Sequence, residues 1–175
     1  MLPRNNFIKI ALLTLILVCT STLSGNGQTV RFNMDVQPEL GVEVLQDLNF
    51  GTVVTNSGTH QIGLGNPRMG IFKIRALAAQ SAILTLQKPK RLTPSNDQDT
   101  TNTMPLTLDA AYSHEVTNYK DYLSFARNEL QITLSGENDD QVWETGYVYI
   151  FGNIDVGDIT PGSYSGTLVL NVVYQ

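Results

Sequence analysis

The chain has 175 residues, of which 42% are hydrophobic and 15% are charged, and its formal net charge is −5. This acidic balance argues against nucleic acids and anionic membranes as partners, because their phosphate groups would repel it. The length suits one domain that buries its own core without disulfides or metals.

The N-terminus is predicted to be a secretory signal peptide. Arg4 and Lys9 form a basic start, and residues 10–18 (IALLTLILV) form an apolar run that is followed by small polar residues. This run is too short to cross a bilayer as a helix. We therefore expect cleavage after Ser24 or after Gly27.

Removal of residues 1–27 would also remove Cys19, the only cysteine. Cys19 raises the alternative of a lipoprotein, but Val18 precedes it where a lipobox needs a small residue. The mature chain would contain no disulfide. It would keep sixteen acidic and nine basic residues, because Arg4 and Lys9 leave with the signal, so its net charge would be −7. We expect an exported protein with no membrane segment left after cleavage.

Residues 28–37 are predicted to form a half-buried N-terminal strand. Apolar residues alternate strictly with polar ones, and this period of two places the apolar side chains on one face. They are Val30, Phe32, Met34 and Val36. Burial of these four side chains would contribute about 6 to 12 kcal/mol as an upper estimate. A whole domain is stable by about 5 to 15 kcal/mol, so this one strand can decide whether its acceptor stays folded.

Residues 38–175 are predicted to form one all-β domain. Short runs rich in β-branched and aromatic residues are separated by Gly, Asn and Pro. The predicted strands are 42–50, 60–64, 71–77, 82–87, 106–111, 130–134, 147–156 and 164–174. This spacing favours an immunoglobulin-like antiparallel β-sandwich, with a barrel as the second choice. One short helix within 110–127 is the remaining helical alternative.

No catalytic, cofactor or metal site is predicted. The two histidines, His60 and His114, lie in polar settings, and the chain has no nucleophile elbow, phosphate loop or cysteine pair. Two distant histidines without cysteine do not make a zinc site. Acidic residues gather at 97–99 and 137–140, but neither group matches a calcium loop, so solvated turns are expected. We therefore expect a protein that is not an enzyme.

Tyrosines offer an alternative binding site. Tyr112, Tyr119 and Tyr122, with His114 and Lys120 beside them, could line a sugar-binding patch, because aromatic rings stack on sugar faces. The competing interpretation is that they pack a long connection onto the sandwich. In the patch alternative, the protein is a self-contained β-sandwich that binds a glycan or a protein through its loops.

The C-terminal strand gives the clearest indication of a partner. One of its faces consists of Leu168, Leu170, Val172 and Tyr174, and its other face is also largely apolar. At a sheet edge, the unpaired N–H and C=O groups of such a strand would recruit another strand. We expect a covering strand, which is either residues 28–37 of the same chain or a strand that a neighbour adds.

Two motifs resemble those of a known family. Residues 48–53 (LNFGTV) resemble the L-x-F-G-T-V element that follows the N-terminal segment of pilin-like secreted bacterial domains. Residues 161–168 (PGSYSGTL), with the ending VYQ, resemble their G-x-Y-S-G-T final strand and its penultimate Tyr. Together with the strand at 154–156, the resemblance spans most of the mature chain. The family that these motifs resemble is a domain family of unknown function, which is akin to spore coat protein U-like and archaic chaperone–usher pilin subunits.

This resemblance implies an immunoglobulin-like fold that lacks its last strand. It also implies a periplasmic chaperone that donates a strand, an outer-membrane usher, and polymerisation with other copies or related subunits through the N-terminal extension. Many chaperone–usher pilins carry a disulfide between early strands, which the mature chain lacks. The implied donor residues are Val30, Phe32, Met34 and Val36, and the implied groove-lining or chaperone-paired residues are Leu168, Leu170, Val172 and Tyr174.

The resulting expectation is a structural subunit of a fimbria-like or coat-like polymer. Such a subunit would pass through the periplasm and end at the cell surface.

Overall fold

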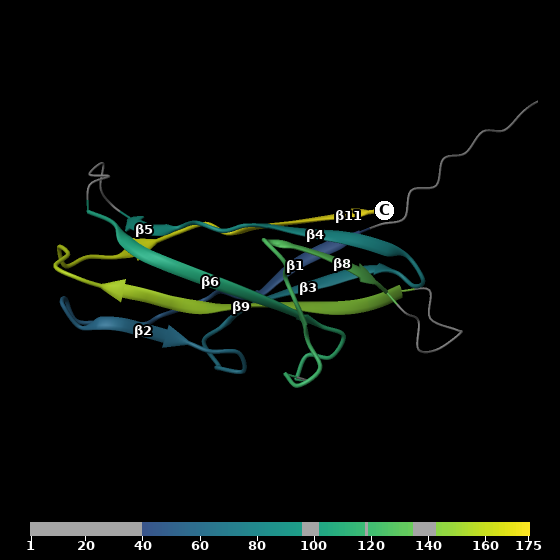
Figure 1. Cartoon of the computed structure of the whole chain (residues 1–175), viewed down its shortest axis with the longest axis horizontal. Helices are drawn as coiled ribbons and strands as arrows, with labels where there is room; N and C mark the ends of the chain where they lie inside the picture. The colour runs from purple at the N-terminus through teal and green to yellow at the C-terminus, as the bar shows by residue number, and fades with distance from the viewer. Residues whose placement is uncertain (1–39, 96–101, 118, 135–142) are drawn as a thin grey trace, which may run out of the picture. The chain divides into compact units, whose positions relative to one another are not determined.

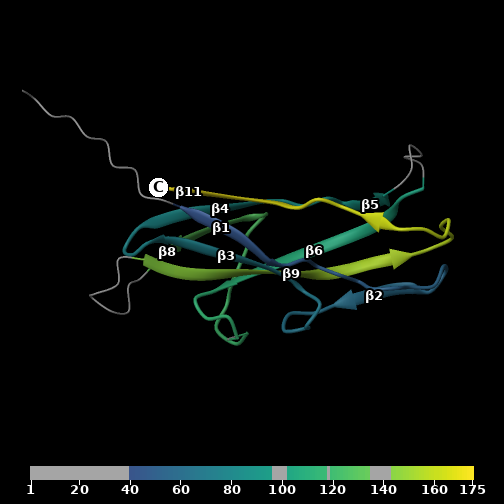
Figure 2. The same ribbon diagram turned by 180° about the vertical axis from the view of Figure 1, so that it is seen from behind.

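The computed structural model describes residues 40–95, 102–117, 119–134 and 143–175 (Figures 1 and 2). Every element of regular secondary structure in these residues is a β-strand, so the all-β prediction is confirmed. The predicted signal peptide and the predicted strand at 28–37 lie outside the described residues. The acidic groups at 97–99 and 137–140 also lie outside them.

The larger of two antiparallel sheets contains eight strands. Its main path runs β1 (Gly41–Gln46), β3 (Gly70–Leu77), β9 (Trp143–Val156), β6 (Met104–Ser113), β5 (Arg91–Pro94) and β10 (Tyr164–Ser165). Two strands lie off this path: β2 (Gly58–Ile62) pairs with the end of β9, and β7 (Leu123–Ser124) pairs with β6. The smaller sheet has the order β11 (Val169–Tyr174), β4 (Ser81–Gln87) and β8 (Glu129–Thr133).

The two sheets form the layers of a β-sandwich (Figure 1). In β6, β9 and β4 the buried residues alternate with more exposed ones, as expected for strands with one face on a core. The small sheet contributes Leu84 and Leu86 to the same core as Leu106, Val148 and Ile150 of the large sheet. The predicted antiparallel sandwich is therefore confirmed.

Strand boundaries show where the sequence pattern was insufficient. The predicted strand at 164–174 is divided in two, because Tyr164 pairs with β5 of the large sheet and Val169 pairs with β4 of the small one. The short strands β5 and β7 were not predicted. The short helix considered within 110–127 is wrong, since the described residues there form the end of β6, turns and β7.

A glycine makes room for a buried tyrosine in the core. Tyr112 is fully buried between the sheets, and its hydroxyl lies 3.3 Å from Nδ1 of His114. A Cβ at Gly146 would lie 2.7 Å from Cζ of the Tyr112 ring, which is far inside van der Waals contact. The tyrosine therefore requires glycine at position 146.

We predict that Gly146→Ala lowers the free energy of unfolding by about 1 to 3 kcal/mol, because the added methyl group overpacks the core. Urea unfolding measures this change. Gly157→Ala is the matched control, since a Cβ there meets no atom within 4 Å. Equal stability of the two variants would contradict the packing described.

Candidate functional site

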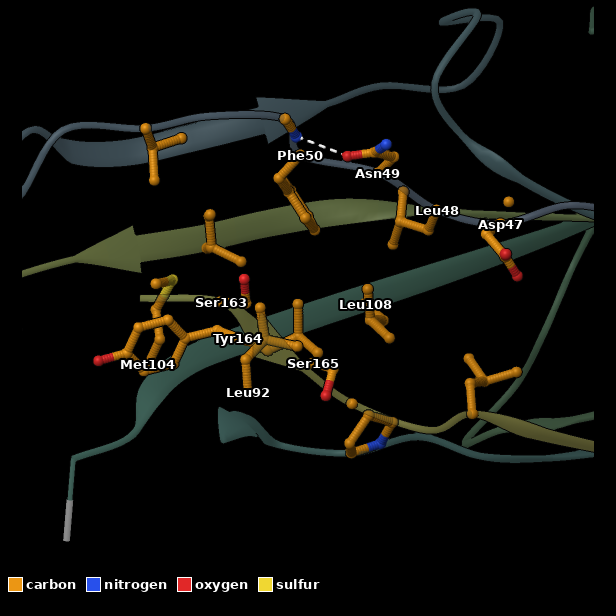
Figure 3. A pocket seen from close by; sticks show the side chains of 18 of the residues that line it. Asp47, Leu48, Asn49, Phe50, Leu92, Met104, Leu108, Ser163, Tyr164 and Ser165 are labelled. Carbon is orange, nitrogen blue, oxygen red and sulfur yellow. Dashed lines mark hydrogen bonds between the residues drawn. The ribbon is translucent and has the colours of Figure 1, made fainter. Parts of the chain in front are cut away.

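A groove with a volume of about 910 Å³ opens over the core-facing side of the large sheet (Figure 3). One wall is the chain that follows β1, residues 46–55, and the other wall is residues 159–168 together with Pro89 and Leu92. A groove of this size lies within the range of clefts that bind ligands or partner segments. Its apolar floor consists of Phe72, Met104, Leu106, Leu108, Ile150, Ile154 and Val156.

The groove adjoins the end of one edge strand, β1, and reaches Leu168, the residue that precedes a second edge strand, β11. Among the described residues, β1 pairs only with β3, and β11 pairs only with β4, so each is the edge strand of its sheet. The outer backbone N–H and C=O groups of an edge strand are available to pair with an added strand. The small sheet thus has space for one more strand next to β11.

Apolar side chains on the core-facing side of β1 are exposed to solvent. Val42 and Val44 lie opposite Ile74 and Phe72 of β3, on the face of the large sheet that bears the core. Ile74 is fully buried, whereas Val42 is 43% exposed and Val44 is 56% exposed. No described strand of the small sheet covers this part of the core-facing surface.

The LNFGTV motif forms one wall of the groove. Leu48 and Phe50 pack against the core, whereas Asn49 and Gly51 between and after them are exposed. The Asn49 side chain accepts a hydrogen bond of 2.8 Å from the Gly51 N–H, and the Asn49 N–H donates to the Arg68 carbonyl at 3.0 Å. Gly51 has a φ of 75°, which favours glycine. These contacts hold the wall against the edge of the large sheet.

Arg68 lies over the same glycine. Its Nη1 donates to the Phe50 carbonyl at 3.4 Å, and a Cβ on Gly51 would lie only 2.8 Å from that nitrogen. The absence of a side chain at Gly51 therefore lets the guanidinium group reach the rim of the groove. Asp47 is exposed at the other end of this stretch (Figure 3).

The four predicted residues of the final strand lie together. Leu168, Leu170, Val172 and Tyr174 are half-buried and pack against the core. Leu168 lines the groove, and the Tyr174 hydroxyl accepts a hydrogen bond of 3.0 Å from the Leu77 N–H. The opposite face of the strand is open, because Val169 is 41% exposed and Val173 is 62% exposed. The predicted donor residues Val30, Phe32, Met34 and Val36 lie outside the described residues.

The tyrosines considered as a sugar-binding patch are separated by the large sheet. Tyr112 is buried in the core between the sheets. Tyr119 packs edge-on against Tyr149, with ring centroids 5.4 Å apart, in a second cluster that includes Ile62. Tyr149 of β9 pairs with Ala111 of β6, which is the residue before Tyr112. Because successive residues of a strand point to opposite faces, Tyr149 and Tyr112 lie on opposite faces of the sheet. The three tyrosines therefore do not form one patch, although Tyr122 is 44% exposed.

The histidines take structural positions. Ser57 Oγ lies 2.7 Å from His60 Nε2 and donates to the Val54 carbonyl. The Ser57 hydroxyl has one proton, which it donates to Val54, so in the contact with His60 the histidine is the donor. A serine nucleophile would instead donate its proton to the histidine. In the described ranges, no group of three or more His, Cys, Asp or Glu could hold a metal ion. The same ranges contain no helix that is long and apolar enough to cross a membrane.

Comparison of the sequence with models of known protein families and with curated proteins finds no match. The site is therefore interpreted from its geometry. Two segments found by family resemblance, LNFGTV and PGSYSGTL, lie on opposite walls of the groove. Leu92 also lines it and was not singled out from the sequence, because β5 is too short to show a strand pattern. Met104 was missed because β6 begins two residues before the predicted strand at 106–111.

The outer tyrosine cluster predicts a pH dependence of stability. Burial raises the pKa of Tyr149 to about 12, with smaller contributions from Tyr119 and Tyr147, and burial also raises the pKa of Tyr112. The unfolded chain loses these protons near pH 10, before the folded chain does. The free energy of unfolding should therefore fall as the pH rises from 10 to 12.

We predict that Tyr149→Phe makes this fall shallower, because one raised pKa is removed. Urea unfolding across this pH range measures the slope. Tyr122→Phe is the control at an exposed position, and it should keep the native slope. An unchanged slope in the Tyr149 variant would contradict the burial of that hydroxyl.

Proposed function

We propose that this chain is a non-enzymatic, exported structural subunit of a fimbria-like or coat-like surface polymer. The subunits assemble by strand exchange, in which the groove of one copy accepts residues 28–37 of another copy as an added strand. The observation that carries this proposal is the apolar groove of about 910 Å³ that adjoins the edge strand β1 and reaches Leu168, just before the edge strand β11.

The dimensions of the groove suit such a strand. The wall from 47 to 55 would extend about 30 Å in strand conformation, and the ten residues 28–37 would extend about 33 Å. Their alternate side chains would contact the apolar floor, and their backbone would pair with the open edges. The bound side chains of this strand would be Val30, Phe32, Met34 and Val36.

Connectivity favours a strand from a second copy. If residues 28–37 folded back on β1 of their own chain, the turn would lie at 37–40, and Val30 would come beside Asp47. The wall from 50 to 55, with the facing wall at 159–163, would then remain uncovered. A strand from another copy has no such limit and can occupy the whole groove.

The apolar groove also explains why a subunit would need another protein to fill it before assembly. An unfilled apolar groove beside unpaired edges promotes aggregation, so a subunit in transit requires a temporary strand. The predicted signal peptide and the resemblance to archaic chaperone–usher pilins support a periplasmic chaperone as the donor of this strand, and an outer-membrane usher as the site of exchange.

We predict that Phe32→Glu abolishes polymerisation, because it would bury an unpaired carboxylate in the groove at a cost of several kcal/mol. The measurement is the ladder of SDS-resistant oligomers that collapses on boiling. Asn33→Glu is the matched control, since its side chain faces away from the floor and the ladder should persist.

A native chain that refolds as a stable monomer, without any ladder, would contradict the proposed function. So would a ladder that tolerates Phe32→Glu as well as it tolerates Asn33→Glu.

A further inference from the structure

The exposed rim of the groove carries one charge of each sign. Asp47, Asn49 and Gly51 are the exposed positions of this wall, and they alternate with Leu48 and Phe50, which pack on the core. Asp47 places a carboxylate at the first of these positions. Gly51 lacks a side chain, and the guanidinium of Arg68 lies over it instead, bonded to the Phe50 carbonyl at 3.4 Å.

The predicted donor strand carries the complementary charges at the same spacing. Between its apolar residues lie Arg31, Asn33 and Asp35. When the apolar residues face the floor of the groove, these three face outward, as do the exposed rim positions. Arg31 and Asp35 are four residues apart, which is about 13 Å in a strand, and Asp47 and Gly51 are also four residues apart.

We propose that these two charge pairs set the register and the direction of the entering strand. Arg31 of one copy pairs with Asp47 of the next, and Asp35 pairs with Arg68. This inference rests on the proposed function, since it requires residues 28–37 to enter the groove. The occupant is a second copy of this chain.

Both pairs form only when the entering strand runs parallel to residues 47–51. In the antiparallel alignment that brings Arg31 to Asp47, Asp35 comes beside β1 instead of Gly51, so it does not reach Arg68. A hairpin within one chain would also be antiparallel, so it could not form both charge pairs. The charges therefore favour exchange between copies over closure of a single chain.

Charge reversal tests the first pair. Asp47→Arg places two cations together and should slow polymer growth about fivefold, as should Arg31→Asp, which places two anions together. A chain with both changes should recover the native rate, because each donor again meets an opposite charge. Both single effects should shrink in about 1 M salt, where the Debye length is about 3 Å.

The second pair is tested in the same way with Arg68→Asp, Asp35→Arg and the double variant. Glu129→Arg on β8 is the control for a change in net charge, because it reverses an exposed acid outside the groove lining. Single variants that grow as fast as this control would overturn the proposal. Double variants that stay slow would also overturn it.

Cysteine pairs report the direction independently. The mature chain has no cysteine once Cys19 is removed. In the parallel register Asn33 lies opposite Asn49, so Asn33→Cys with Asn49→Cys should form a disulfide between copies. Asn33→Cys with Leu45→Cys should not, because those positions meet only in the antiparallel alignment. The opposite result would overturn the register.

These outcomes separate the two proposals. A native chain without a ladder contradicts the proposed function itself. A native ladder with unaffected charge variants and no disulfide between positions 33 and 49 leaves strand exchange intact and contradicts only the register.

Discussion

The uncovered apolar stretch along β1 and the groove beyond it determines the other properties of this domain. Burial of apolar surface is the main force that stabilises a sandwich, and it requires each core-facing strand to be covered by the opposite sheet. Here Val42 and Val44 face the core side of the large sheet but remain 43% and 56% exposed. The large groove continues this uncovered stretch past the end of β1. A strand added here would cover apolar side chains that no described strand covers.

The local structure of the groove follows from the same constraint. Its floor consists of ordinary core residues, and the wall that follows β1, residues 47–55, lies outside the strands. The chain after β1 is held by a few specific contacts, including the Asn49 side chain on the Gly51 N–H. Such a wall keeps its outer backbone groups available for a partner. Strand addition would supply both the missing apolar cover and the missing backbone hydrogen bonds, and this explains why one ten-residue segment can control stability and assembly together.

Much of the fold could be predicted from the sequence, because long strands with one buried face produce a clear period of two. The number and spacing of the short strand-like runs, with the turn residues between them, predicted the sandwich. The division of the last strand was not predicted, since Tyr164 to Tyr174 reads as one continuous run although it enters two sheets. Periodicity describes faces, and it does not say which sheet a strand joins.

The candidate site was less accessible to sequence reasoning. The two wall motifs were found through a family resemblance, and the final strand through its apolar faces. The floor includes Leu106 and Ile154, which are distant in sequence and ordinary in kind, so only the register of β6 and β9 brings them together. Likewise, the position of Arg68 over Gly51 depends on a left-handed glycine, and no sequence pattern predicts it.

Hydrogen–deuterium exchange on the monomer and on the assembled polymer tests strand exchange most directly. An added strand gives hydrogen-bond partners to the edge amides of the groove, so these amides should exchange more slowly in the polymer. The account predicts new protection in three segments: 28–37, 47–55 and 168–174. Equal exchange of these segments in both states, with protection confined to other surfaces, would show that the subunits associate without inserting a strand and would contradict the account.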